Sequence, residues 1–137
     1  MPSDSLENLV KIGQLKEEVY NEAEFNGLLD SARDKLNDVA TGKLSFSSRF
    51  DLTYNAAHSL ALAALRYSGF RSDKRYLVFQ CLVHTIAMNR AKVRVFGLCH
   101  ERRNLAEYEG RLEVDEQLQT ELLKLSQELL AEVISLD

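Results

Sequence analysis

A group of polar residues in the segment 99–110 has the side chains that acid–base and phosphate chemistry uses. The segment reads Cys-His-Glu-Arg-Arg-Asn-Leu-Ala-Glu-Tyr-Glu-Gly. If it is a helix, at about 100° per residue, one polar stripe carries His100, Arg103, Asn104 and Glu107, with Tyr108 beside Asn104 one turn further on. Side chains three or four residues apart touch on a helix. We therefore expect His100 to meet Arg103 and Asn104. We expect Arg103 also to meet Glu107.

This polar stripe has two interpretations. Histidine titrates near neutral pH and arginine binds phosphate, so the stripe could form a site for phosphate chemistry. Alternatively, Arg103 and Glu107 form an ordinary surface ion pair, which stabilises a helix by about 0.2–0.5 kcal/mol, and His100 is structural. The opposite face of the helix is expected to be apolar, with Val95, Leu98, Cys99, Leu105 and Ala106.

The composition predicts an all-helical protein. The chain has 137 residues, which suits a single domain with a core over residues 1–137. Hydrophobic residues make up 45% and charged residues 28%, as is usual for soluble globular proteins. The one proline is Pro2 and there are six glycines, so few residues oppose helix formation.

Several classes of protein are disfavoured by the sequence. No apolar run approaches the roughly 18 residues of a membrane span, and the first residues lack the basic and apolar regions of a signal peptide. Cys81 and Cys99 are too few for a disulfide framework, so we expect buried, reduced thiols in a cytoplasmic protein. There is no Gly-rich phosphate loop, CxxC pair or Glu-x-x-His motif, so we expect neither a metal site nor another cofactor.

Charge is distributed unevenly along the chain. The net charge is −4, but residues 66–103 contain nine basic and two acidic residues, which gives this stretch +7 and the rest of the chain −11. Such a stretch suits an anionic partner or an acidic patch on another protein. Alternatively, the basic middle and the acidic flanks neutralise each other within one fold.

The spacing of apolar residues predicts an up-and-down bundle of four to five helices with a short N-terminal helix packed on it. The N-terminal helix lies within residues 1–21 and carries apolar residues from Leu6 to Leu15. The bundle helices are expected at about 22–40, 48–67, 73–88, 92–109 (or from Arg90) and 116–135. Their expected caps are Asn21, Ser47 or Ser48, Ser72 or Asp73, and Asp115, and their expected stops include Gly42, Gly69 and Gly110.

The helix over residues 48–67 is expected to be the central one, or one that also meets another subunit. Its middle reads Ala-Ala-His-Ser-Leu-Ala-Leu-Ala-Ala-Leu, which is apolar nearly all round and typical of a helix buried on most faces. Asn55 and His58 are its polar intrusions. Each is either a satisfied buried group or part of a pocket, and for Asn55 we favour the buried group.

Two stretches together resemble a known family. Residues 49–58 read Arg-Phe-Asp-Leu-Thr-Tyr-Asn-Ala-Ala-His, and Arg103-Asn104 is followed by an acidic residue and a tyrosine at Glu107-Tyr108. These residues resemble the bacterial HEPN superfamily, small helical domains found with nucleotidyltransferases and in toxin–antitoxin modules. The resemblance covers about residues 23–137 and implies a helical bundle that pairs across a cleft.

Many members of this superfamily are metal-independent ribonucleases, and their motif is an arginine, a polar residue and, a few positions later, a histidine. Arg103 and Asn104 match its first half. Tyr108, Glu109 and Gly110 stand where the histidine would lie, and His100 precedes Arg103 by one turn instead. Cleavage needs a base, an acid and a cation. Arg103 could supply the cation and His100 the acid or base.

Two hypotheses about function remain open. In the first, a HEPN-like homodimer binds RNA or nucleotide in a toxin–antitoxin or nucleotidyltransferase context, with weak or absent ribonuclease activity. Its catalytic residues would be Arg103, His100 and Asn104, and its binding residues Glu107, Tyr108, Asn55, Lys92 and Arg94, the last two holding phosphates. In the second, a dimeric module without catalysis binds an antitoxin or nucleotidyltransferase, and the polar residues are structural. An Arg103 buried against Glu107 or Asp51 would favour the second hypothesis.

Overall fold

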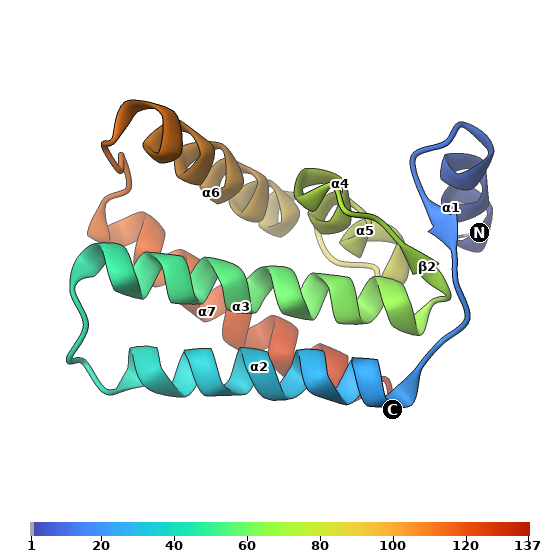
Figure 1. Ribbon diagram of the computed structural model, residues 1–137, viewed down its shortest axis with the longest axis horizontal. Helices are drawn as coiled ribbons and strands as arrows, with labels where there is room; N and C mark the ends of the chain where they lie inside the picture. Colours follow the sequence, from blue (N-terminus) through green and yellow to red (C-terminus); the bar gives the residue numbers. More distant parts are fainter. Residues whose placement is uncertain (1) are drawn as a thin grey trace.

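The computed structural model describes residues 2–137, with side chains from Asp4 onward, and the chain is mainly helical (Figure 1). The all-helical prediction is therefore confirmed. The helices are α1 (Pro2–Lys11), α2 (Glu22–Ala40), α3 (Phe46–Tyr67), α4 (Arg75–Gln80), α5 (Leu82–Thr85), α6 (Arg90–Glu109) and α7 (Glu116–Ile134). Helices α2, α3 and α7 lie side by side, and α6 with the short α4 and α5 covers another side of α3 (Figure 1).

Helix α3 is the centre of the molecule, as its composition predicts. It contacts α2, α4, α5, α6 and α7. Its small residues are almost fully buried, which lets these neighbours approach closely. They include Ala56, Ala57, Ala61, Ala63 and Ala64. One hydrophobic core, with residues from α1 to α7, surrounds this helix.

The ends of the long helices follow local sequence signals. The side chain of Asn21 accepts a hydrogen bond from the Glu24 amide at 2.8 Å, and Asp115 caps α7 through the Leu118 amide at 2.8 Å. Both caps were predicted. Helix α3 instead begins one turn earlier than Ser48 suggests, because Ser45 is extended and its hydroxyl accepts from the Ser48 amide at 3.3 Å.

The N-terminal segment differs from the prediction, because its helix stops at Lys11 and does not continue through Leu15. Gly13 is left-handed, with φ 79°, and residues 16–17 form strand β1 (Lys16–Glu17). Strand β1 pairs antiparallel with β2 (Phe70–Arg71). Leu15 is buried from the turn. Apolar spacing could not reveal this, since a buried Leu15 fits either conformation.

The single helix predicted over residues 73–88 is two short helices, α4 and α5, that meet at Cys81. The amides of His84 and Thr85 both donate to the Cys81 carbonyl, at 2.8 and 2.9 Å, so the helical hydrogen-bond pattern changes there. Helix α4 begins after Lys74 and has no side-chain cap, so neither Ser72 nor Asp73 caps it.

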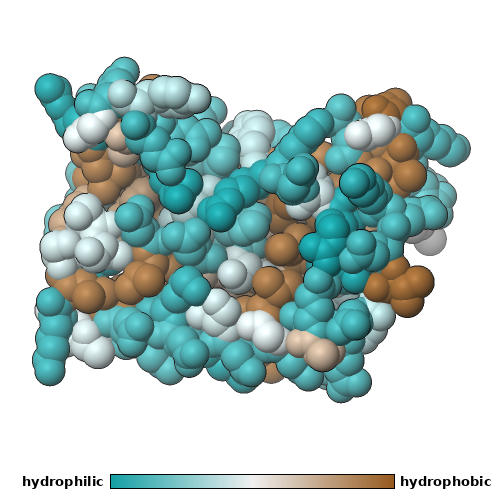
Figure 2. All heavy atoms as spheres, viewed as in Figure 1, coloured by the Kyte–Doolittle hydropathy of each residue, from teal (hydrophilic) through white to brown (hydrophobic). Residues whose placement is uncertain are grey.

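The buried side of α6 also differs from the prediction. Its buried residues are Val93, Phe96, Gly97 and Cys99, all in the first half of the helix, whereas Leu98 and Leu105 are exposed. The second half of α6 therefore rests less on the bundle. On the face in Figure 2, hydrophobic residues form separate areas with hydrophilic side chains between them. In the described chain, no helix combines the length and the apolar character needed to cross a bilayer.

Candidate functional site

The candidate site is built on Tyr54, a fully buried residue of α3. Its ring packs against Phe50 and Phe79, with centroids 6.3 and 5.8 Å away. Its hydroxyl oxygen lies 2.7 Å from Nδ1 of His100 on α6. A buried tyrosine hydroxyl needs such a partner, so this hydrogen bond fixes α6 relative to α3.

His100 uses both of its ring nitrogens inside the protein. The side-chain amide nitrogen of Asn104, one turn later, donates to Nε2 at 3.1 Å. In a neutral imidazole one nitrogen accepts and the other donates, so Nδ1 then donates to the oxygen of Tyr54. Burial lowers the pKa of His100, and the positive charges of Arg75 and Arg103 lower it further. His100 is therefore neutral at neutral pH.

Two guanidinium groups lie near the ring of Tyr54. The central carbon of the Arg103 guanidinium is 5.0 Å from the ring centroid, and that of Arg75, at the start of α4, is 5.7 Å away. Both distances are those of cation–π contacts. Desolvation raises the pKa of the Tyr54 hydroxyl, although Arg75 acts to lower it. Tyr54 therefore stays protonated beside these two cations.

The two arginines differ in their anionic partners. Nη1 of Arg103 lies 3.2 Å from a carboxylate oxygen of Glu107, and the Arg103 side chain is 25% exposed. Arg75 donates to the side-chain oxygen of Asn55 at 3.0 Å, and in the part of the chain described here no carboxylate forms an ion pair with it. These residues around Tyr54 form the Tyr54 cluster. It holds two positive charges and one ion-paired carboxylate.

His58 is a second neutral histidine beside this cluster. Its ring meets Phe79 edge-on, with centroids 5.9 Å apart. Burial is the main cause that lowers its pKa to about 4, and the charges of Arg75, His100 and Arg103 act in the same direction. A positive charge at this position is thus disfavoured, which leaves the two arginines as the cations of the cluster.

A pocket of about 190 Å³ gives access to Arg103. Its lining is Ser47, Asp51, Arg103, Ala106, Glu107 and Leu112. Two of these side chains are acidic, so an anion that binds Arg103 must compete with the carboxylate of Glu107. Glu107 is itself 60% exposed and can turn into solvent.

The structure brings together most, but not all, of the site residues predicted from the sequence. His100 meets Asn104 and Arg103 meets Glu107 as the helical spacing predicts, whereas Arg103 packs on Tyr54 and no hydrogen bond joins it to His100. The predicted Tyr108 is 91% exposed and lies outside the cluster.

The remaining predicted binding residues lie in different surroundings. Asn55 is half-buried and is satisfied by the Asp51 carbonyl and by Arg75, so it is a hydrogen-bonded part of the cluster. Lys92 pairs with Glu128 of α7 at 3.3 Å, so its charge is matched within the fold. Arg94 is exposed and lines another pocket.

The ion pairs also bear on the two interpretations of the basic stretch. Five of its nine cations have carboxylate partners in the fold: Arg66, Arg71, Lys92, Arg102 and Arg103. In the described chain, four have no such partner: Lys74, Arg75, Arg90 and Arg94. These four lie on or beside α4 and at the start of α6. Ion pairs within the fold therefore neutralise most cations of the basic stretch. The region around α4 and the start of α6 keeps its positive charge.

Sequence reasoning missed three residues of the site: Tyr54, Arg75 and Tyr76, whose ring stacks on that of His100. Tyr54 had a usable signal, because a tyrosine in a helix apolar on most sides must find a hydrogen-bond partner. Arg75 and Tyr76 had none, since tertiary packing of α4 brings them to the cluster.

The cysteines and potential metal ligands suggest no further chemistry at this site. Both cysteines are free and buried, as predicted, and burial raises the pKa of Cys81 to about 11 and of Cys99 to about 12. Among the residues that the structure describes, no three His, Cys, Asp or Glu side chains gather as metal ligands.

Comparisons of the chain with protein-family models, with curated proteins and with solved structures found no match.

Proposed function

We propose that the protein is a HEPN-like module that binds RNA or a nucleotide through a phosphate group at the Tyr54 cluster, with weak or absent cleavage. The observation that carries this proposal is the pair of guanidinium groups, from α4 and α6, near one buried ring. In the described chain no carboxylate forms an ion pair with Arg75. The carboxylate that pairs with Arg103, that of Glu107, is exposed. Arginine is well suited to hold phosphate oxygens.

The same geometry argues for binding over efficient cleavage. A general base must have a free lone pair within reach of the substrate proton. His100 is neutral, but its nitrogens are bonded to Tyr54 and Asn104, so it would have to break one of these bonds. We infer that His100 is a positioning residue that keeps α3 and α6 in register.

The wider context of the proposal comes from the sequence resemblance. Arg103-Asn104 and the stretch 49–58 resemble HEPN domains, which supports a cytoplasmic homodimer that works with an antitoxin or a nucleotidyltransferase. Leu98 and Leu105 are exposed one above the other on α6 and would supply apolar contacts for such pairing.

A second candidate function is a protein-interaction module in which the polar cluster is only structural. The observation that favours it is that Arg103 is mostly buried and paired with Glu107, while His100 is bonded internally. In that case the arginines stabilise the packing of α4 and α6 on α3 and bind no RNA.

The deciding experiment measures RNA binding and cleavage by the purified protein and its variants. Fluorescence anisotropy of a labelled single-stranded RNA between about 50 and 200 mM salt gives the affinity and its salt slope. We expect Arg75→Gln and Arg103→Gln each to weaken binding and to reduce the slope by about 0.7, the contribution of one phosphate contact. Lys43→Gln, at an exposed lysine near the start of α3, is the matched control for charge.

Cleavage is followed in the same samples in the presence of a metal chelator. We expect little or none. Strong cleavage that is lost in both Arg103→Ala and His100→Ala would overturn the positioning role of His100 and make the protein a ribonuclease. RNA binding that is unchanged in the folded Arg75→Gln and Arg103→Gln variants would exclude this site and favour the protein-interaction module.

A further inference from the structure

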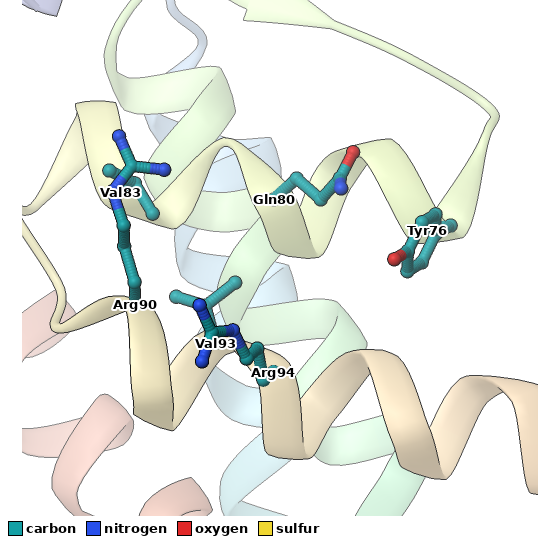
Figure 3. Close-up of a pocket in the computed structure, with 6 residues that line it drawn as sticks. All are labelled: Tyr76, Gln80, Val83, Arg90, Val93 and Arg94. Atoms are coloured by element: carbon teal, nitrogen blue, oxygen red, sulfur yellow. The ribbon is translucent and has the colours of Figure 1, made fainter.

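A second pocket, of about 250 Å³, lies between α6 and the short helices α4 and α5 (Figure 3). Its lining is Tyr76, Gln80, Val83, Arg90, Val93 and Arg94. Arg90 reaches from the start of α6 toward Val83, while Tyr76 and Gln80 come from α4 (Figure 3). The pocket therefore combines two cations, one aromatic ring and apolar side chains, and none of its lining residues is acidic.

The two arginines of this pocket differ from the other cations of α6. Lys92 and Arg102 pair with carboxylates of Glu128 and Glu113. Arg90 and Arg94 are one turn apart, both are exposed, and within the described chain neither forms an ion pair. On α6, the cations on the side of α7 are thus paired with carboxylates, and the two cations on the side of α4 are not. An anion entering the pocket would meet two guanidinium groups without displacing a carboxylate.

Tyr76 stands between this pocket and the Tyr54 cluster. It stacks on the ring of His100, with centroids 5.9 Å apart and 21° between the planes. It lies so close to α6 that a Cβ on Gly97 would be 3.0 Å from the tyrosine ring. Yet 44% of Tyr76 is exposed. The ring is held in place by His100 and Gly97 while part of it stays open to a ligand.

We propose that this pocket is a nucleotide subsite for single-stranded RNA, in which Arg90 and Arg94 hold a phosphate and Tyr76 contacts a base. This inference rests on the proposed function, because it extends the same RNA from the Arg75–Arg103 pair to a second cationic pair. Sites for single strands combine a basic groove with aromatic rings on which bases stack. Duplex RNA keeps its bases stacked inside and cannot use Tyr76 in this way.

The groove continues beyond this subsite. A neighbouring pocket of about 230 Å³ shares Gln80, Val83 and Arg90 with it and extends to Leu9 of α1. His84 also lines it, and burial and then the charge of Arg90 lower the pKa of that histidine. No acidic residue lines this pocket either. These two adjoining pockets therefore form a continuous path without a carboxylate.

The test measures the binding of a fluorescein-labelled oligouridine RNA of about ten nucleotides to the full chain. It compares variants of the Arg90–Arg94 pair with variants of the Arg75–Arg103 pair. Arg90→Gln/Arg94→Gln should weaken binding and reduce the salt slope by about 1.4, the value for two phosphate contacts on a single strand. Lys43→Gln/Lys124→Gln removes the same charge from exposed lysines outside the groove, and should leave the slope unchanged. A blunt duplex RNA should bind more weakly than the single strand.

The aromatic contact is tested separately. Tyr76→Leu should weaken binding roughly tenfold, as expected for the loss of one base–aromatic stack, and Tyr76→Phe should keep the wild-type affinity. Loss of affinity in Tyr76→Phe as well would contradict a stacking role for the ring.

The outcomes separate this inference from the proposed function. If Arg75→Gln/Arg103→Gln weakens binding and Arg90→Gln/Arg94→Gln does not, the subsite is overturned and the proposed function stands. If only Arg90→Gln/Arg94→Gln weakens binding, the pocket holds the RNA and the phosphate site at Tyr54 is overturned. If duplex RNA binds as tightly as the single strand, the assignment to single-stranded RNA fails.

Discussion

Two polar clusters lie along α3, and they differ in how their charges are matched. Toward the end of the helix, Arg66 is 1% exposed and donates to the Glu24 carboxylate at 2.5 Å. Toward its start, the Tyr54 cluster has two arginines, two neutral histidines and one exposed carboxylate partner. The first cluster thus uses its charges inside the fold, and the second leaves positive charge in excess.

The Arg66 cluster joins four segments of the chain, which are α2, α3, β2 and the residues that follow β1. The guanidinium of Arg66 donates to the carbonyls of Glu18, Val19 and Phe70, at 2.9, 2.6 and 3.3 Å. Arg71 pairs with Glu18 at 2.7 Å and also with Glu24. Burial acts to raise the pKa of Glu24, but the hydrogen bonds from Arg66 and Arg71 outweigh it and hold that pKa below its usual value.

The comparison suggests how to separate a structural arginine from a binding one in this fold. A guanidinium whose donors end on carboxylates and backbone carbonyls has nothing left for a ligand, and its removal leaves buried acceptors unsatisfied. A guanidinium near an aromatic ring with few carboxylates adds little to stability and keeps donors for an anion. Loss of Arg66 should therefore lower stability, whereas loss of Arg75 or Arg103 should mainly lower RNA affinity.

The largest expected effect is on stability, from Arg66→Met. Removing one partner of a buried ion pair destabilises a protein by about 3–5 kcal/mol, and here three backbone carbonyls also lose a donor. Urea unfolding measures the change. Arg71→Met is the matched control, and we expect a smaller loss because Arg71 is one-third exposed. A loss below about 1 kcal/mol for Arg66→Met would contradict the structural role of this cluster.

The second largest expected effect is a loss of stability at acidic pH, caused by protonation of His58 beside Tyr54. The pKa of His58 is lowered to about 4 in the folded state, so the unfolded chain takes up the proton first. Stability is full above the ordinary pKa of about 6.5 and falls as the pH drops from there toward 4, by on the order of 2–3 kcal/mol. The lowered pKa of His100 acts in the same direction.

Urea unfolding at about pH 7.5 and about pH 4.5 tests this linkage. The wild-type protein should lose more stability between the two than His58→Gln, which has no imidazole to protonate. Equal losses in the two proteins would assign the acid sensitivity to other groups, of which His100 is the first candidate because its pKa is also lowered.

A smaller effect is expected from Tyr54→Phe, which removes the partner of His100 Nδ1 and keeps the ring. An unsatisfied buried donor costs about 1–3 kcal/mol, and the loss of this bond should also change the proton distribution on the imidazole. Nitrogen NMR of His100, together with urea unfolding, follows both effects. The control is Tyr67→Phe, at an exposed tyrosine of the same helix. Unchanged His100 signals in Tyr54→Phe would show that the bond does not orient the ring.

Local signals in the sequence were enough for the long helices. Asn21, Asp115 and Gly110 end or begin their helices through their own backbone and side chains, so no distant residue is needed. The pairing of Lys16 with Arg71 and the change of helix at Cys81 depend on contacts between distant segments. Such contacts leave no periodic pattern, which is why both features were missed.

The same division applies to the candidate site. The stripe of His100, Asn104 and Glu107 follows from helical spacing alone, and its contacts within α6 are confirmed. Arg75 and Tyr76 reach the site only because α4 packs against α3 and α6. The excess of positive charge was visible in the sequence, but which cations are matched depends on partners as distant as Glu24 and Glu128.

The smallest expected effect on stability, and the sharpest test of the comparison, comes from Glu107→Gln. The Arg103–Glu107 pair is an exposed helical pair, so its loss should change the free energy of unfolding by about 0.5 kcal/mol or less. RNA affinity should rise a few-fold, because an incoming phosphate no longer competes with a carboxylate for Arg103. Glu109→Gln, one of the exposed acidic residues of the same turn, is the control for charge alone. An equal rise in both variants would mean that general repulsion, and not release of Arg103, limits binding.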